Sequence, residues 1–391
     1  MSVLFYLAPV IAWLALNSNK KLTRWRLLLV LGLFAKIIFS FLMTYLVINN
    51  YDFGDLPTYY TFAKELAAGD YGDWVGLISG SYLVALLNSI LFQLLPPSIY
   101  GLATFTGISS FLYCYFTIRS FDIYFSKSDL FKVAALLLFM PVLGTQSGYI
   151  GKETYILPLL GYVFLAFRIH QRITVWIAIS VVVIGMIRPY QAIVLIIALV
   201  YSAIVFTPKR YKIKALIVIF LFLSVGFVLF GSFFTDQVSL ILEFGAAQFL
   251  ADTYAGGNLM LDPFPQPFTI LQNFRPFFWE AHNFMSMVAS VENMIPFAFG
   301  FLFVFHYIRH SIFRSELNSS PLLTFTLLYV MLNMIMFMYN SNIGDLARRH
   351  IYYYPQLILL GYFALISRKY SKIGYSNSEI LNHKQESVSC R

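Results

Sequence analysis

Residues 27–48 read LLLVLGLFAKIIFSFLMTYLVI, a run that is apolar except for a few small polar side chains and the single charge of Lys36. A bilayer core of about 30 Å needs roughly 17–25 apolar residues in one α-helix. Runs of this kind recur along the chain, and we predict crossings at 2–16, 27–48, 99–117, 129–143, 154–167, 173–187, 190–206, 215–231, 284–305, 321–340 and 351–367. The pattern predicts an all-α, polytopic integral membrane protein with about eleven transmembrane helices.

The composition agrees with a membrane chain. Of 391 residues, 59% are hydrophobic and 12% are charged, whereas a soluble domain carries about 25% charged residues. The net charge of +9 comes from short basic clusters between apolar runs, which is typical of cytoplasmic loops and argues against a nucleic-acid partner. Two cysteines, Cys114 and Cys390, exclude a disulfide framework and a zinc spacing.

The distribution of basic residues predicts the topology. Residues 78–95 are apolar enough to cross, but a crossing there would send the basic loops at 168–172 and 209–214 outside. We therefore predict a re-entrant or surface-lying helix at 78–95, an outer N-terminus and a cytoplasmic C-terminus. One transmembrane domain then spans 1–372, with long outer loops at 49–98 and 232–283 and a polar cytoplasmic tail at 373–391.

Ionisable residues of the predicted outer face fall into compact groups at helix ends. The candidates are Asp52 and Asp55; Lys152 and Glu153; Arg188; Arg275, Glu280 and His282; and Arg348 and Arg349. Ionisable groups beside the apolar slab are costly and, when retained, usually serve substrates, ions or partners. The carboxylates could act as a general base or hold a divalent cation, and the arginines could bind phosphate through paired hydrogen bonds.

Simpler structural interpretations stand beside these. Asp52 and Asp55 could cap the following helix, and Lys152 and Glu153 could form a local ion pair. Arg188 could extend its charge to the membrane interface from a helix end. The stretch RPFFWEAHN at 275–283 could be an interfacial aromatic belt.

Two outer stretches carry a family resemblance. Residues 55–74, DLPTYYTFAKELAAGDYGDW, resemble the first outer loop of GT-C superfamily glycosyltransferases, which often carry an acidic residue, a paired tyrosine, a short helix and Gly-Asp-Trp. Residues 348–355, RRHIYYYP, are similar to the basic-Tyr-Pro entry to a late helix in that superfamily. In size and arginine-rich outer face the chain also resembles bacterial O-antigen and exopolysaccharide polymerases. It departs from the pattern at the usual acidic pair, which is here Gly54-Asp55.

The resemblance implies transfer of a sugar or oligosaccharide from a polyprenyl-phosphate or diphosphate donor to a lipid-linked or glycan acceptor, at the outer face of the bacterial inner membrane. Asp55, with Asp52 and Glu280 as further candidates, would supply the catalytic carboxylate. The arginines, with Lys152, Glu153 and His282, would bind substrate, while Trp279 and Tyr60 would stack on sugar rings. No cofactor is implied beyond the divalent cation left open above, and no metal-ligating residues are assigned.

A transporter is the alternative. A lipid-linked oligosaccharide flippase would use the same membrane-embedded donor, but transporters usually place polar groups near the membrane midplane. In this chain the polar groups lie at one rim, and Lys36 is the charge expected near the centre.

Overall fold

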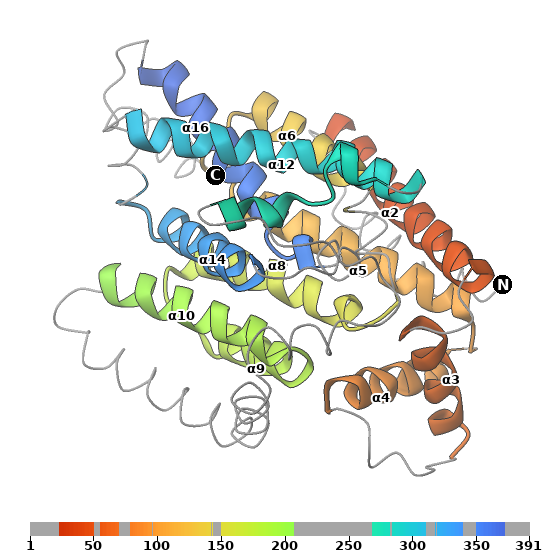
Figure 1. Cartoon of the computed structure of the whole chain (residues 1–391). Helices are drawn as coiled ribbons and strands as arrows, with labels where there is room; N and C mark the ends of the chain where they lie inside the picture. The colour runs from red at the N-terminus through yellow and green to blue at the C-terminus, as the bar shows by residue number, and fades with distance from the viewer. Residues whose placement is uncertain are drawn as a thin grey trace.

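The computed structural model describes residues 23–50, 55–69, 79–95, 97–141, 143, 150–206, 268–281, 284–309, 317, 319–338 and 349–371. Within these ranges every regular element is helical, and Figure 1 shows how the helices pack. They are α2 (Thr23–Asn50), α3 (Asp55–Ala67), α4 (Ser79–Leu94), α5 (Ile99–Ser120), α6 (Lys127–Phe139), α8 (Glu153–His170), α9 (Val175–Ile187), α10 (Pro189–Phe206), α12 (Phe284–Arg309), α14 (Pro321–Phe337) and α16 (Tyr354–Ser371), with the short 3-10 helices η3 (Phe268–Phe274) and η4 (Phe278–Glu280). The all-α prediction is confirmed for the described residues.

Helix length and composition identify a membrane protein. In the described part, four helices are long and apolar enough to span a bilayer: Trp25–Asn49, Ile99–Ser120, Pro189–Phe206 and Ser286–Arg309. Shorter apolar helices occur at Gly80–Leu94, Val175–Ile187, Pro321–Phe337 and Tyr354–Ser367. The predicted crossings at 2–16 and 215–231, and the cytoplasmic tail, lie outside the described residues. The chain is therefore an all-α membrane protein, and the count of eleven crossings stays a prediction.

Local sequence signals explain where several helices begin. The side chains of Ser98, Ser126, Thr174 and Ser320 each accept a hydrogen bond from a backbone N–H in the first turn of the helix that follows. Such caps satisfy N–H groups that have no partner within the helix. The chain enters each of these helices at a defined residue, which fixes where neighbouring loops lie.

Small residues allow the central helices to pack closely. A Cβ atom at Gly107 of α5 would lie 2.7 Å from the Ile37 Cα of α2, and one at Gly161 of α8 would lie 2.9 Å from the Tyr113 carbonyl oxygen of α5. Helices in membranes associate largely through such close packing, because lipid tails leave little hydrophobic driving force between them. Helix α5 therefore packs closely against both α2 and α8.

The segment at 78–95 forms helix α4, as predicted. It lies against α3, and Figure 1 shows the pair beside the end of the bundle where α2 ends and α5 begins. The side chains of Tyr59, Ala63 and Leu66 on α3 are buried, and the Tyr59 hydroxyl lies 3.2 Å from the Ser81 hydroxyl. The position of α3 and α4 relative to the membrane surface stays a prediction.

The two ends of α8 carry different charged clusters. At its C-terminal end, Arg168 pairs with Asp122, which also pairs with Arg119 at 3.2 Å. At its N-terminal end, Glu153 begins the helix. Among the residues predicted to carry function, Glu153, Arg188 and Arg349 lie at this second end.

Candidate functional site

A buried ion pair joins α8 to the junction of α9 and α10. Arg188 is the residue between these two helices, and Pro189 starts α10 with a φ angle that already suits a helix. The Arg188 guanidinium donates through Nη2 to Oε1 of Glu153, and the two side chains are 13% and 3% exposed. Arg188 is thus held inside the protein by a carboxylate and does not simply extend toward the membrane interface.

Tyr352 completes this pair from the turn that precedes α16. Its hydroxyl donates to Glu153 Oε1 at 3.2 Å, and its ring centre lies 5.7 Å from the guanidinium carbon of Arg188. The Tyr352 hydroxyl and the Arg188 guanidinium therefore both donate to Oε1 of Glu153.

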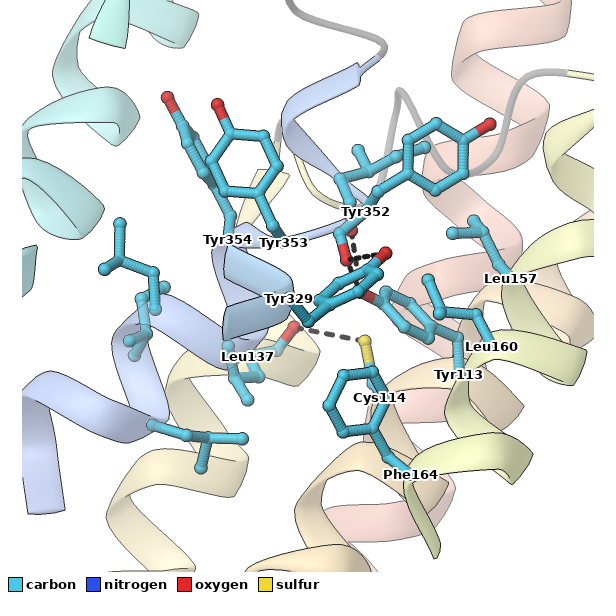
Figure 2. Close-up of a cluster of buried hydrophobic side chains, with 14 of the residues drawn as sticks. Tyr113, Cys114, Leu137, Leu157, Leu160, Phe164, Tyr329, Tyr352, Tyr353 and Tyr354 are labelled. Carbon is cyan, nitrogen blue, oxygen red and sulfur yellow. Dashed lines mark hydrogen bonds between the residues drawn. The ribbon is translucent and has the colours of Figure 1, made fainter. Parts of the chain in front are cut away.

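The backbone around Tyr352 is held from below by two buried tyrosines, which Figure 2 shows. The Tyr113 hydroxyl lies 2.8 Å from the Ile351 carbonyl and 2.9 Å from the Tyr352 carbonyl. The Tyr329 hydroxyl approaches the same Tyr352 carbonyl at 3.3 Å. Because α5 and α14 supply these hydroxyls, the turn carrying Tyr352 is fixed to the centre of the bundle.

Arg349 lies next to the Arg188 pair across one aromatic ring. Its guanidinium carbon is 5.3 Å from the ring centre of Tyr190 and 4.9 Å from that of Phe337. Tyr190 and Phe337 meet edge to face with ring centres 5.8 Å apart. The hydroxyl of Tyr190 also accepts a hydrogen bond from Arg188 Nη1. Tyr190 therefore contacts both arginines.

The residues just described form the arginine cluster: Glu153, Arg188, Tyr190, Phe337, Arg349 and Tyr352. They come from the start of α8, the α9–α10 junction, the end of α14 and the segment before α16. Guanidinium groups beside carboxylate and phenol groups can bind an anion and orient hydroxyl groups. Three of the ionisable residues assigned by sequence to the outer face, Glu153, Arg188 and Arg349, thus lie together in this cluster, while their roles in substrate binding stay predictions.

A second charged group lies between η3 and α12. Arg275 donates to Glu280 Oε1 through Nε at 2.7 Å and through Nη2 at 2.6 Å, and through Nη1 to Gln272 Oε1 at 3.0 Å. The other oxygen of Glu280 accepts the backbone N–H of Phe277 at 2.8 Å. Both charged side chains of the pair are 8% exposed. This geometry favours a structural role in which Arg275 and Glu280 shape the turn, and their assigned roles in substrate binding and catalysis stay predictions.

The tyrosine run that precedes and begins α16 connects the two groups. Tyr352 contacts Glu153, whereas the Tyr353 hydroxyl lies 2.9 Å from Asn273 Oδ1 and the Tyr354 hydroxyl 2.8 Å from the Asn273 carbonyl. Asn273 belongs to η3, two residues before Arg275. The described part of the stretch singled out by sequence, residues 349–355, thus connects the arginine cluster to the loop before α12.

The loop before α12 presents two large aromatic side chains outward. Phe278 and Trp279 are 65% and 77% exposed, and the Trp279 ring stacks on that of Phe277 with centres 5.0 Å apart. An exposed indole suits either interpretation made from the sequence, a sugar-stacking surface or an interfacial aromatic belt.

The other candidates lie next to the cluster, on α3, or outside the described residues. Tyr60 packs edge to face against Phe92 of α4 with ring centres 5.6 Å apart, and Lys152 occupies the position before α8. Residues Asp52, His282 and Arg348, and the side chain of Asp55, are not among those that the structure describes. The catalytic assignment of Asp55 and the divalent cation left open at Asp52 and Asp55 therefore stay predictions.

Sequence reasoning missed the aromatic members of the cluster. Tyr190 follows directly after Arg188-Pro189, and Tyr352 lies in the quoted run at 348–355. An aromatic residue two positions from an arginine at a helix junction was the signal available for Tyr190, and it is a weak one, because this chain contains 27 tyrosines.

No protein-family model, no curated protein and no solved structure matches this chain. A proposal for the function therefore rests on the geometry of the arginine cluster and the loop before α12.

Proposed function

We propose that the chain is a glycosyltransferase of the GT-C type, acting as a polymerase in the assembly of O-antigen or exopolysaccharide. Its donor would be a sugar or oligosaccharide linked to a polyprenyl phosphate or diphosphate, and its acceptor a lipid-linked or other glycan. The observation that supports this most is the convergence of Arg188 and Arg349 on one ring beside Glu153 and Tyr352.

In the proposed reaction Asp55, the arginines and Trp279 each have a different role. The acceptor hydroxyl attacks the anomeric carbon of the donor, and the bond from that carbon to the phosphate oxygen breaks. Asp55 takes the proton of the hydroxyl as general base. The arginines stabilise the negative charge that develops on the leaving phosphate, because donors fixed in a dry site need no reorganisation during the reaction. Trp279, which is exposed in the loop before α12, stacks on a sugar ring.

The setting of the proposal is the outer face of the bacterial inner membrane. Nucleotide sugars are confined to the cytoplasm, so a donor used outside must arrive attached to lipid. The proposal includes the GT-C-like arrangement of about eleven crossings, with the arginine cluster at the outer end and the Arg168–Asp122 pair at the cytoplasmic end. Positive charges favour the cytoplasmic side, so an outer arginine pair needs a ligand or a buried partner to stabilise it.

Transfer by purified protein tests the proposal. The chain, reconstituted in nanodiscs with a polyprenyl-diphosphate-linked oligosaccharide, should produce longer lipid-linked glycans. Translocation of a labelled donor across proteoliposomes without any change in glycan length would overturn the enzyme assignment.

A flippase for the same donor is the second candidate, and Lys36 favours it. The Lys36 side chain lies midway along the candidate span Trp25–Asn49 and is completely buried. Among the ion pairs of the described residues, none includes Lys36. Ionisable groups within a membrane often mark a transport path. The transporter would be the better assignment if two results were found together. Wild type would translocate the donor in proteoliposomes without any glycan transfer, and Lys36→Met would abolish that translocation.

A further inference from the structure

Tyr190 contacts both arginines of the arginine cluster, Arg188 through its hydroxyl and Arg349 through its ring. Its hydroxyl accepts from Arg188 Nη1, and its ring centre lies 5.7 Å from the Arg188 guanidinium carbon and 5.3 Å from that of Arg349. The two guanidinium carbons are therefore at most about 11 Å apart, the sum of those two distances. Two like charges this close repel each other, more strongly in a buried site than in water.

The surroundings of Tyr190 keep its ring in place. Pro189 fixes the backbone at the start of α10, and Phe337 of α14 packs edge to face against the ring. An aromatic face attracts cations through its quadrupole. A rigid ring between the arginines can therefore set how far apart the two guanidinium groups lie and which way they face.

We propose that Tyr190 is a positioning residue that holds Arg188 and Arg349 as a pair for one phosphate-bearing anion. The hydroxyl orients Arg188 and the ring orients Arg349. This inference rests on the proposed function for the identity of the anion, a polyprenyl-linked phosphate or diphosphate. Fixed guanidinium groups bind phosphate oxygens through paired hydrogen bonds with little loss of side-chain freedom. The upper limit of about 11 Å between the two guanidinium carbons is compatible with a diphosphate that contacts both arginines.

Binding of inorganic pyrophosphate, measured by calorimetry on the full chain in phosphatidylcholine nanodiscs, tests the inference without any sugar transfer. Tyr190→Leu removes the ring and the hydroxyl, and should weaken pyrophosphate binding at least about tenfold. Tyr190→Phe keeps the ring packed on Phe337 and removes the hydrogen bond to Arg188, so it should weaken binding about threefold or more. Tyr201→Leu is the matched control, because Tyr201 lies on the same helix and is 51% exposed; it should bind like wild type.

A variant set separates positioning from a general effect on folding. Arg188→Lys should cost less affinity in the Tyr190→Phe background than in wild type, because part of the contribution of Arg188 depends on its hydrogen bond to the Tyr190 hydroxyl. Adding Arg349→Lys should still weaken binding severalfold. Equal pyrophosphate affinity in wild type and Tyr190→Phe would overturn the inference, even if Tyr190→Leu failed to fold. A wild-type protein that binds neither pyrophosphate nor phosphate would overturn it as well.

The outcomes distinguish this inference from the proposed function. Tyr190-dependent pyrophosphate binding by a protein that transfers no sugar would support the pair and refute the glycosyltransferase. Normal glycan transfer by a Tyr190→Phe protein that binds pyrophosphate like wild type would support the enzyme and refute the role of Tyr190.

Discussion

Replacing Glu153 with glutamine should destabilise the protein strongly, because it leaves the Arg188 charge in a buried site without its carboxylate. The side chains of the pair are 3% and 13% exposed, so solvent screens them little. Breaking a buried ion pair from one side costs about 3–5 kcal/mol. Glutamine keeps an oxygen that can accept from the Tyr352 hydroxyl, which sets the expected loss near the lower limit, at about 3 kcal/mol.

Equilibrium unfolding in mixed micelles with increasing dodecyl sulfate measures the free energy of unfolding. Glu153→Gln combined with Arg188→Met should recover most of the loss, because removing both charges leaves nothing uncompensated. Lys132→Met is the matched control. The Lys132 Nζ lies 3.9 Å from Asp129 Oδ1, and the Lys132 side chain is 66% exposed. Its removal should therefore change the free energy of unfolding by less than about 1 kcal/mol.

The reasoning is refuted if Glu153→Gln costs no more than Lys132→Met. It is also refuted if the double variant loses the sum of the two single losses, because independent effects would mean that Glu153 and Arg188 do not stabilise each other.

Three further changes test other parts of the structure. Asp55→Asn should reduce glycan transfer about 10²–10⁴-fold while the protein still folds, because a general base acts in the transition state; near-normal transfer would move the catalytic role to another carboxylate. Lys36→Met should raise the free energy of unfolding by about 1 kcal/mol or more, since a buried ammonium is costly; a fall would mean that Lys36 makes a stabilising contact. Tyr352→Phe should lower the free energy of unfolding by about 1.5 kcal/mol or more, because it removes the hydrogen bond from the phenol to the buried Glu153 carboxylate; an unchanged free energy of unfolding would contradict this.

The positions of the helices could be predicted from the sequence because each buried segment carries its own apolar run. Helices α5 and α10 begin within one residue of the predicted starts at 99 and 190. Helix α4, predicted at 78–95, occupies Ser79–Leu94 for the same reason. These apolar runs are local, so they survive without knowledge of the tertiary structure.

The contacts within the site could be predicted less well. The sequence suggested that Glu153, Arg188 and Arg349 share one end of the bundle, but the partners of each charge depend on packing between distant segments. Glu153 pairs with Arg188 across 35 positions and with Tyr352 across 199. A local ion pair of Arg275 with Glu280 could have been foreseen from their spacing, yet Arg275 was assigned to substrate binding and Glu280 to catalysis.

Arg349 offers the most direct test of the proposed function. Its guanidinium contacts two aromatic rings and faces the Arg188 pair, a setting in which lysine keeps the charge but loses the planar, paired donors. The measurement is glycan elongation by the purified chain in nanodiscs with a polyprenyl-diphosphate-linked donor. Elongation by wild type, with Arg349→Lys nearly as impaired as Arg349→Ala, is the predicted result. Full elongation by Arg349→Lys, or none by wild type, would contradict it.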